Sequence, residues 1–279
     1  MADHITGRGG AVVEVPTRRT VRSRRRYGAS KSDVIDAEAC ARACLEAPLG
    51  VVVHVDEFEA IRVLVRWRES LVHTQTRAIC RIKARISQIE PQAARGLRLT
   101  TSVGWSRLAR YEPAGHGRHR DAIRDLVRYE ATQAGERLTQ IRSLERRLAD
   151  EMPDPGQALI DTIQGIGPIG AATILAEVGD VTRFRSEAAF AMWAAAAPLD
   201  ASSGQQHRHR HNRGGNRQID RVLDTVIRVQ LIHNGQAARY VERRRTNGDN
   251  TREAFRALKR QLSRKVYRIL KRHPATQTT

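Results

Sequence analysis

Cysteine is scarce in this sequence, and long apolar runs are missing. The three cysteines, Cys40, Cys44 and Cys80, are an odd number and lie in sequence typical of helices, so we interpret them as free thiols in a reducing compartment. No Cys/His pattern has the spacing of a zinc site. No apolar run approaches the roughly 18 residues of a membrane-spanning helix, and no signal-peptide layout is found. We therefore expect a cytoplasmic protein without a membrane partner.

Acidic residues are also few relative to basic ones. The chain of 279 residues contains 49 Lys and Arg against 30 Asp and Glu, which gives a formal net charge of +19. Such a charge favours a polyanionic partner, and arginine suits phosphate groups better than a membrane surface. A GC-rich genome would raise arginine over lysine, but it does not account for the net charge. The length allows one large domain or two modest ones.

Apolar residues recur at helical spacing through the middle of the chain. They predict one amphipathic helix over about residues 58–86 and a second over about 119–149, with a break over 91–117. Four apolar residues of the second helix fall seven apart, as in a coiled-coil seam: Val127, Ala134, Ile141 and Leu148. Glu130 and Arg137 intrude beside this seam. A helical hairpin within the chain and a contact between copies both remain open.

The first part of the sequence combines a strand pattern, a basic stretch and the start of a helix. Residues 11–16 are typical of a strand, and the basic stretch that follows includes Arg24, Arg25 and Arg26. A helix is expected over about residues 31–45. A lone strand cannot stand by itself, so the strand over 11–16 needs a sheet around it.

Asp33 and Asp36 lie three residues apart at the start of that helix, so both carboxylates share one face. Paired acids of this kind can hold Mg²⁺ for phosphodiester chemistry. Alternatively, Asp33 caps the helix and Asp36 lies in its first turn, where acids satisfy free N–H groups. The sequence leaves both interpretations open.

Three glycines, Gly165, Gly167 and Gly170, separate an apolar stretch over 159–163 from a run of good helix formers over 171–177. They predict a sharp turn between two short helices, the second beginning at Pro168. A helix N-terminus behind small residues offers free N–H groups to an anion, as helix-hairpin-helix elements do for a nucleic-acid phosphate. The alternative is an ordinary packing corner between two helices.

A loop over residues 198–204, with Ser202 and Ser203, precedes a strip rich in arginine and histidine. Serine beside guanidinium groups suits phosphoryl chemistry, although a Ser-Ser-Gly sequence is also typical of a surface loop. The histidines alternate and could ligate a metal on a strand, but the arginines between them argue against it. We interpret the strip as a phosphate-contacting surface. Its members are His207, Arg208, His209, Arg210, His211, Arg213 and Arg217.

Two more helices are expected in the remainder of the chain. Residues 212–216 end the strip, a helix follows over about 217–232, and Asn247 with Gly248 marks a turn. The last helix is basic with one apolar stripe, made of Phe255, Leu258, Leu262, Val266 and Ile269. The fold class predicted from these patterns is mainly α.

Several motifs together resemble one family, the DEDD-type transposases of the bacterial IS110 group of insertion sequences. The motifs are KSD with DAEA at residues 31–39, GIGPIGAATILAEVGDVTRFRS, APLDASSG with RHRHNRGGNRQIDRVL, and REAFRALKRQLSRKVYRIL. The resemblance covers almost the whole chain. It implies a RuvC-like α/β domain with four acids, a helical coiled-coil segment and a helical C-terminal domain with a nucleophilic serine.

The resemblance also implies what the parts do. The serine attacks a DNA phosphodiester and forms a phosphoserine link, while the acids and Mg²⁺ assist from another subunit. Such proteins act as oligomers guided by a structured RNA, which would make this chain nucleoid-associated. Asp33 and Asp36 match the last two acids, Ser203 matches the serine best, and Ser202 is the alternative.

The N-terminus departs from the family pattern, in which strands carrying an Asp and a Glu precede the segment that begins here at Val12. Asp3 lies in no apolar strand, and Glu14 lies in the wrong strand. We therefore expect a truncated transposase that is inactive by itself, or a nucleic-acid-binding remnant without chemistry. The expected divisions are a truncated RuvC-like remnant, a coiled-coil segment, the serine-bearing domain and a basic helix, at residues 1–57, 58–152, 153–235 and 236–279.

Overall fold

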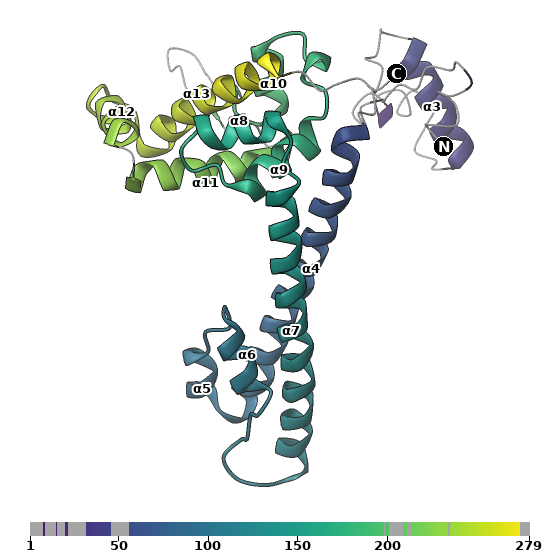
Figure 1. Ribbon diagram of the computed structural model, residues 1–279, viewed down its shortest axis with the longest axis vertical. Coiled ribbons are helices and arrows are strands. Elements are labelled where there is room, and N and C mark those ends of the chain that lie inside the picture. The colour runs from purple at the N-terminus through teal and green to yellow at the C-terminus, as the bar shows by residue number, and fades with distance from the viewer. Residues whose placement is uncertain are drawn as a thin grey trace.

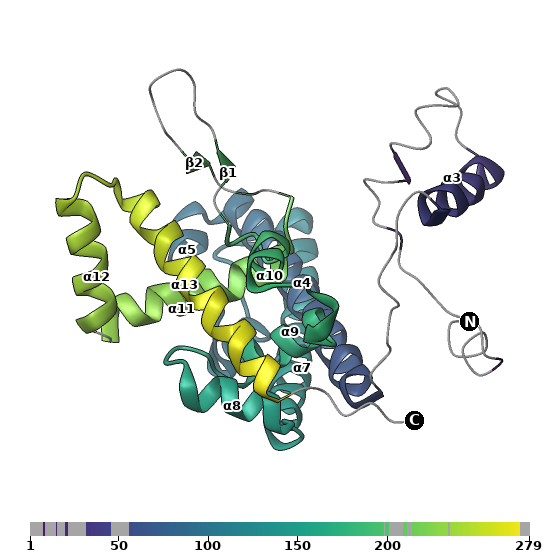
Figure 2. The same cartoon turned by 90° about the horizontal axis from the view of Figure 1, so that it is seen from above.

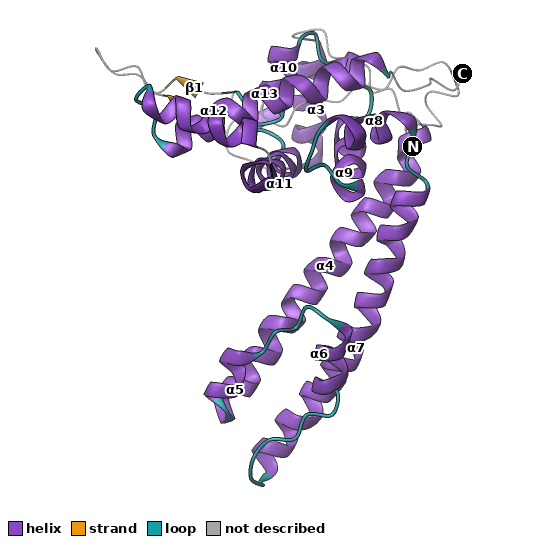
Figure 3. Cartoon of the chain, turned by 60° about the vertical axis from the view of Figure 1, so that its left-hand side comes forward, coloured by secondary structure: helices purple, strands orange, loops and turns teal. Residues whose placement is uncertain are grey.

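The computed structural model describes residues 32–45, 56–197, 199–200, 209–210, 212, 214–233 and 235–273, with single positions 8, 15, 20 and 21. Nearly all of these residues are helical, which confirms the mainly α class (Figure 3). Helix α3 (Asp33–Leu45) lies where the sequence predicted it. Apart from Val15, the strand expected over 11–16 lies outside the described residues, as do the arginines at 24–26. In the described part of the chain, no helix is long and apolar enough to cross a bilayer.

Two long helices, α4 (Asp56–Ile89) and α7 (Arg118–Asp150), lie side by side as a hairpin (Figure 1). All four residues of the predicted seam are buried, and the facing apolar residues come from α4. The seam is therefore filled within the chain, which favours the intramolecular hairpin of the two alternatives. The apolar partners from α4 are Phe58, Ile61, Leu64, Val65, Ile82 and Ile86.

The charged residues beside the seam have partners on α4. The Arg137 guanidinium donates to Gln75 Oε1 at 3.2 Å, and the Gln75 amide donates to the Ala134 carbonyl at 3.1 Å. Arg81 makes two hydrogen bonds of 3.0 Å to Glu130. A polar layer in a helical seam fixes register, since a shift would leave these groups without partners. The Gln75–Arg137 pair lies between the two apolar clusters of the hairpin, whereas the Arg81–Glu130 pair lies beside the second cluster.

The break between the long helices contains two short ones, α5 (Pro91–Gly96) and α6 (Ser102–Leu108). The Thr101 hydroxyl accepts a hydrogen bond from the Gly104 amide and so caps α6. Trp105, 1% exposed, packs in the second apolar cluster with residues of α4 and α7. The region is therefore a small folded tip at the end of the hairpin away from residues 154–272 (Figure 1).

At the other end of the hairpin, six helices and one 3-10 turn pack around a single core (Figure 2). Helix α9 is buried along most of its length and touches α4, α7, α8 and α11. Helices on both sides of the expected division at residues 235 and 236 contribute to this core. The elements are α8 (Asp154–Thr162), α9 (Pro168–Val178), η1 (Val181–Arg183), α10 (Glu187–Trp193), α11 (Arg217–His233), α12 (Gly235–Thr246) and α13 (Thr251–Arg272).

An aromatic cluster fixes α10 against α13. Phe190 of α10 lies 5.6 Å from Tyr267 of α13 and 5.2 Å from Phe184, between ring centroids. At the start of α10, the Glu187 carboxylate pairs with Arg264 at 2.9 Å and Arg268 at 3.2 Å. Aromatic pairs at these distances stabilise packing beyond the area they bury. The position of α10 matters because the chain continues from its end into the serine segment.

Candidate functional site

The segment that contains both serines lies between two short paired strands. Strand β1 (Leu199–Asp200) pairs antiparallel with β2 (His209–Arg210), with Leu199 opposite Arg210 and Asp200 opposite His209. The two ends of the intervening segment are therefore held together. We call β1, β2 and the segment between them the serine hairpin. Ser202, Ser203, Arg208 and Arg213 lie outside the described residues, as do His207 and His211.

Asn212 ties the chain after β2 to the end of α10. It is 9% exposed, and its amide nitrogen donates to the Met192 carbonyl at 2.8 Å. Its amide oxygen accepts from the Gly214 N–H at 3.0 Å. A buried amide that satisfies two backbone groups holds both of them in place. Asn212 therefore fixes the path by which the chain leaves the serine hairpin.

Gly215 is needed at its position because another backbone segment approaches it closely. A Cβ added there would lie 2.5 Å from the Ala195 nitrogen and 2.6 Å from the Ala195 Cα. Ala195 itself has a φ of 59°, in the left-handed region that side chains rarely adopt. The backbones of the segments before β1 and after β2 are thus in close contact at the base of the serine hairpin.

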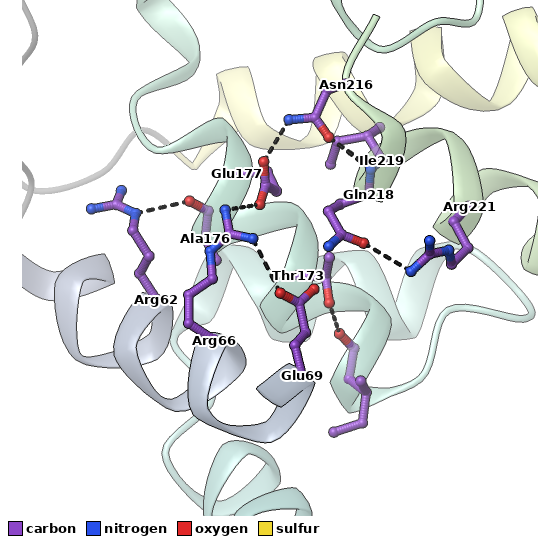
Figure 4. A network of polar contacts seen from close by, with 11 residues as sticks. Arg62, Arg66, Glu69, Thr173, Ala176, Glu177, Asn216, Gln218, Ile219 and Arg221 are labelled. Carbon is purple, nitrogen blue, oxygen red and sulfur yellow. Dashed lines mark hydrogen bonds and ion pairs between the residues drawn. The ribbon is translucent and has the colours of Figure 1, made fainter. Parts of the chain in front are cut away.

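Asn216 connects this base to the helical core (Figure 4). Its side-chain oxygen accepts from the N–H groups of Gln218 and Ile219 at 3.0 Å, which caps α11. Its amide nitrogen lies 2.5 Å from Glu177 on α9. The Glu177 carboxylate also pairs with Arg66 on α4 at 2.5 Å. The base of the serine hairpin is therefore linked to α4, α9, α10 and α11.

A hollow of about 510 Å³ lies beside this base, between Ala195, Gly215 and the first turns of α11. Two exposed cations, Arg217 and Arg221, line it, together with Asp220 and Asp224. Arginine pairs with phosphate oxygens through its planar guanidinium. The predicted residue Arg217 therefore does lie next to the anchored ends of the serine segment.

Lys259, on α13, partly neutralises the two acids of the hollow. Its ammonium lies 2.6 Å from Asp220 and 2.6 Å from Asp224, and the residue is only 6% exposed. Lys259 was not among the residues predicted from the sequence. Its signals were an acid pair four residues apart in α11 and a lysine on the apolar stripe of α13, between Leu258 and Leu262.

Near this site, burial and next the charge of Arg264 lower the pKa of Arg260, against the opposing effect of Glu187. The Arg260 guanidinium donates to the Glu187 carbonyl at 3.2 Å. This bond adds to the two ion pairs of the Glu187 side chain, so the start of α10 is bound to three arginines of α13. These three arginines therefore hold α10 and α13 together.

The three glycines of the predicted turn have different surroundings. Gly165 has a φ of 95°, and a Cβ there would lie 3.2 Å from the Val229 side chain of α11. Gly170 is half-buried against Val222. Gly167 is exposed with nothing within 4 Å of a Cβ, and it precedes Pro168, where α9 begins as predicted. The turn is thus a packing corner at Gly165 and an open helix N-terminus at Gly167.

Asp33 and Asp36 lie in the first turn of α3, and Ser32 caps that helix. The Ser32 hydroxyl accepts from the Ile35 N–H at 3.3 Å, and its carbonyl accepts from the Asp36 N–H at 2.9 Å. This corrects the alternative in which Asp33 is the cap. Among the described residues, no three His, Cys, Asp or Glu side chains gather as a metal site would require. The two carboxylates offer only part of the oxygen set that a divalent ion takes.

Comparisons with known proteins point to one family. The family model described as the transposase IS116/IS110/IS902 family matches residues 157–242, from α8 through the serine segment into α12. A second transposase model, for the DEDD type of the IS110 group, matches residues 6–91, which include Asp33 and Asp36.

Curated relatives agree with these matches. A probable family 20 transposase of Pseudomonas aeruginosa is 29% identical over 211 residues, which are 74% of this chain and 59% of the relative. An uncharacterised 43.6 kDa protein of insertion element IS110 from Streptomyces coelicolor is 28% identical, over 88% of this chain and 71% of the relative. The transposase for insertion sequence element IS1328 of Yersinia enterocolitica is 27% identical, over 86% and 70%. The chain belongs to the IS116/IS110/IS902 family of insertion-sequence transposases.

Proposed function

We propose that this chain is a DNA transposase that attacks a phosphodiester through Ser203, with Ser202 as the alternative nucleophile. The observation that carries the proposal is the anchoring of the serine segment. Both of its ends are held by Asn212, Gly215 and Asn216 beside the exposed Arg217, all within the region matched by the family model. A nucleophile needs such fixed support, because misplacement by about 1 Å costs on the order of 10²-fold in rate.

The proposed step exchanges one phosphodiester for another. The serine oxygen forms a bond to phosphorus, the bond from phosphorus to a sugar oxygen breaks, and the serine proton is transferred to that leaving oxygen. A later attack by a sugar hydroxyl on the serine-linked phosphorus reverses the exchange and joins DNA to a new end. In this proposal, Arg208, Arg210, Arg213 and Arg217 bind the phosphate oxygens.

The remaining partners follow from the family. Domains of the DEDD type generally use divalent metal ions, and Asp33 and Asp36 would supply two carboxylate ligands for Mg²⁺. The other ligands must come from residues outside the described part or from another copy of the chain. A homo-oligomer and a structured guide RNA complete the proposal, together with Arg24, Arg25 and Arg26 as nucleic-acid contacts. The open Gly167, with Gly165 and Gly170 forming the turn, would bind a phosphate at the N-terminus of α9.

The test is a covalent adduct between the purified chain and DNA of the element's end, with guide RNA and Mg²⁺ present. We expect an adduct that Ser203→Ala abolishes and Ser202→Ala preserves. An adduct that survives both substitutions would overturn the serine assignment. Salt-dependent DNA binding without an adduct at any Mg²⁺ concentration would favour the second candidate, a nucleic-acid-binding remnant. That candidate is supported by the formal net charge of +19, which attracts a polyanion whether or not the chain cleaves it.

A further inference from the structure

A second hollow of about 630 Å³ lies at the far end of α11, between α11, α12 and α13. Helix α11 has 17 residues and is therefore roughly 25 Å long, with the serine anchor at its first turn and this groove at its last. The groove is thus separate from the proposed reaction site. We propose that it binds an unpaired nucleic-acid segment, with phosphates on its arginines and a base against Tyr240. This inference rests on the proposed function, because both assign nucleic acid as the ligand.

The charge of the groove is of one sign. Arg239 and Arg243 of α12 and Lys265 of α13 line it, and no acidic side chain is among its lining residues. The lysine ammonium donates to the Thr162 carbonyl at 2.8 Å, so it is held in position by the end of α8. A volume of this size suits a ligand of one or two nucleotides rather than a duplex, given pockets of about 300–1,000 Å³ for small ligands.

The four arginines of α12 fall into two classes. Arg244 pairs with Asp249 at 2.5 Å, and Arg245 pairs with Glu242 at 3.2 Å. Arg239 and Arg243, which line the groove, have no acidic partner among the described residues. Neutralised arginines contribute little to binding an anion, whereas unpaired ones attract phosphate. The unpaired positive charge of this helix is therefore concentrated on the groove.

The groove also has an apolar floor with an aromatic ring. Tyr240 is half-buried, the Arg243 guanidinium lies 5.6 Å from its ring centroid, and the buried Leu258 and Leu262 also line the groove. A nucleobase stacks on such a ring and is sequence-tolerant, because every base has a π-face. Side-chain amides at the walls can hydrogen-bond with base edges. Gln261 lines the groove with such an amide, whereas the Gln230 amide is buried and donates to the glycine turn.

The groove is joined to the glycine turn. The Gln230 amide donates to the Gln164 carbonyl at 2.8 Å, and the Gln164 amide donates to the His233 carbonyl at 3.4 Å. With the Lys265 bond to Thr162, these contacts fix the end of α8 and the turn against the groove wall. The groove and the turn therefore form one surface, on which a strand bound in the groove lies close to the open N-terminus of α9.

The experiment measures the binding of a short labelled single strand and of its duplex to the full chain by fluorescence anisotropy, at several salt concentrations. The test variants are the double substitution Arg239→Gln with Arg243→Gln, and Tyr240→Ala. The matched control is Arg245→Gln, which removes one charge from the same helix outside the groove. Tyr240→Phe keeps the ring and serves as the control for stacking. Circular dichroism of every variant verifies that it is folded.

We expect the double variant to bind the single strand more weakly and to lower the salt slope by about 1.4, since each lost phosphate contact contributes about 0.7. Tyr240→Ala should weaken single-strand binding by about 5- to 160-fold, the range that corresponds to the loss of one base–aromatic stack. Tyr240→Phe and Arg245→Gln should bind within about twofold of the parent.

Three results would overturn the inference: no loss in the groove variants, an equal loss per charge in Arg245→Gln, or an equal loss for the duplex. The serine adduct is scored separately. If the adduct forms while the groove variants bind normally, the groove inference fails and the proposed function stands. If the groove variants lose single-strand binding while no adduct forms, the catalytic proposal fails and the groove stands.

Discussion

The amide nitrogen of Asn216 lies 2.5 Å from the carboxylate of Glu177, and this contact joins the start of α11 to α9 at the base of the serine hairpin. The same Asn216 side chain caps α11 through its oxygen. One residue thus fixes both the direction of α11 and the position at which the chain leaves the hairpin.

Asn216→Ala is expected to lower the free energy of unfolding by about 1–2 kcal/mol, because it removes a helix cap and the hydrogen bond to Glu177. Asn216→Asp keeps the cap but places a second carboxylate against Glu177, so it should also destabilise the chain. Denaturant unfolding measures both. Thr225→Ala, on the exposed side of α11, should change the free energy by less than about 0.5 kcal/mol. Equal stability of Asn216→Ala and Thr225→Ala would contradict the anchoring role.

Gly215→Ala should destabilise the base of the serine hairpin by about 1–3 kcal/mol, because its methyl group would overlap the backbone of Ala195. The matched control is Gly214→Ala, whose Cβ would lie 3.5 Å from the Asn212 side chain, an ordinary contact. The midpoint temperature of thermal unfolding and the yield of the DNA adduct should both decrease in Gly215→Ala. Both should stay near the parent level in Gly214→Ala. A tolerated Gly215→Ala would show that the two segments are not in close contact.

Lys259→Met should lower stability by about 1–3 kcal/mol, because it removes the ammonium that lies 2.6 Å from both Asp220 and Asp224. The figure lies below that for a fully buried pair, since Asp224 is half exposed. Adding Asp220→Asn and Asp224→Asn to Lys259→Met should restore most of the loss. Denaturant unfolding of the single and triple variants measures this. If the triple variant is no more stable than the single one, lost packing rather than charge explains the effect.

The folded tip of the α4–α7 hairpin should lose stability at acid pH. A hydrogen bond from the Tyr111 hydroxyl at 2.6 Å, and then one from the Ala114 N–H, lower the pKa of Glu90. Because the folded pKa lies below the unfolded one, the stabilisation is present above the ordinary Glu pKa of about 4.3 and is lost as pH falls through the folded pKa.

The midpoint temperature of thermal unfolding should therefore fall more steeply below about pH 4.3 in the parent than in Glu90→Gln, whose side chain cannot ionise. Glu136→Gln, an exposed residue on α7, should follow the parent curve. Burial, and next the hydrogen bond to Glu90, raise the pKa of Tyr111. Its contribution is present at neutral pH and is lost as pH rises above about 10, the ordinary tyrosine value. Identical acid profiles for the parent and Glu90→Gln would rule out this account.

Periodic apolar patterns predicted the long helices within a few residues. The second long helix was expected from about 119 and begins at Arg118, and the helix after the Arg/His strip begins at Arg217 as expected. Helix α12 was not predicted. Only two of its residues, Ala237 and Val241, are buried apolar ones, so its apolar signal is weak. The tip helices α5 and α6 are likewise too short to produce a periodic signal.

The sequence by itself determined the helical class, the seam of α7, the turn before Pro168 and the family motifs, because each depends on residues close together in the chain. Only the tertiary structure decided that the seam is filled by α4, that Gly215 touches Ala195, and that Asn216 binds Glu177. It also decided that Lys259 neutralises Asp220 and Asp224 from another helix. The reason is physical. Contacts between residues 20 to 111 positions apart depend on how helices pack, and no local spacing encodes that packing.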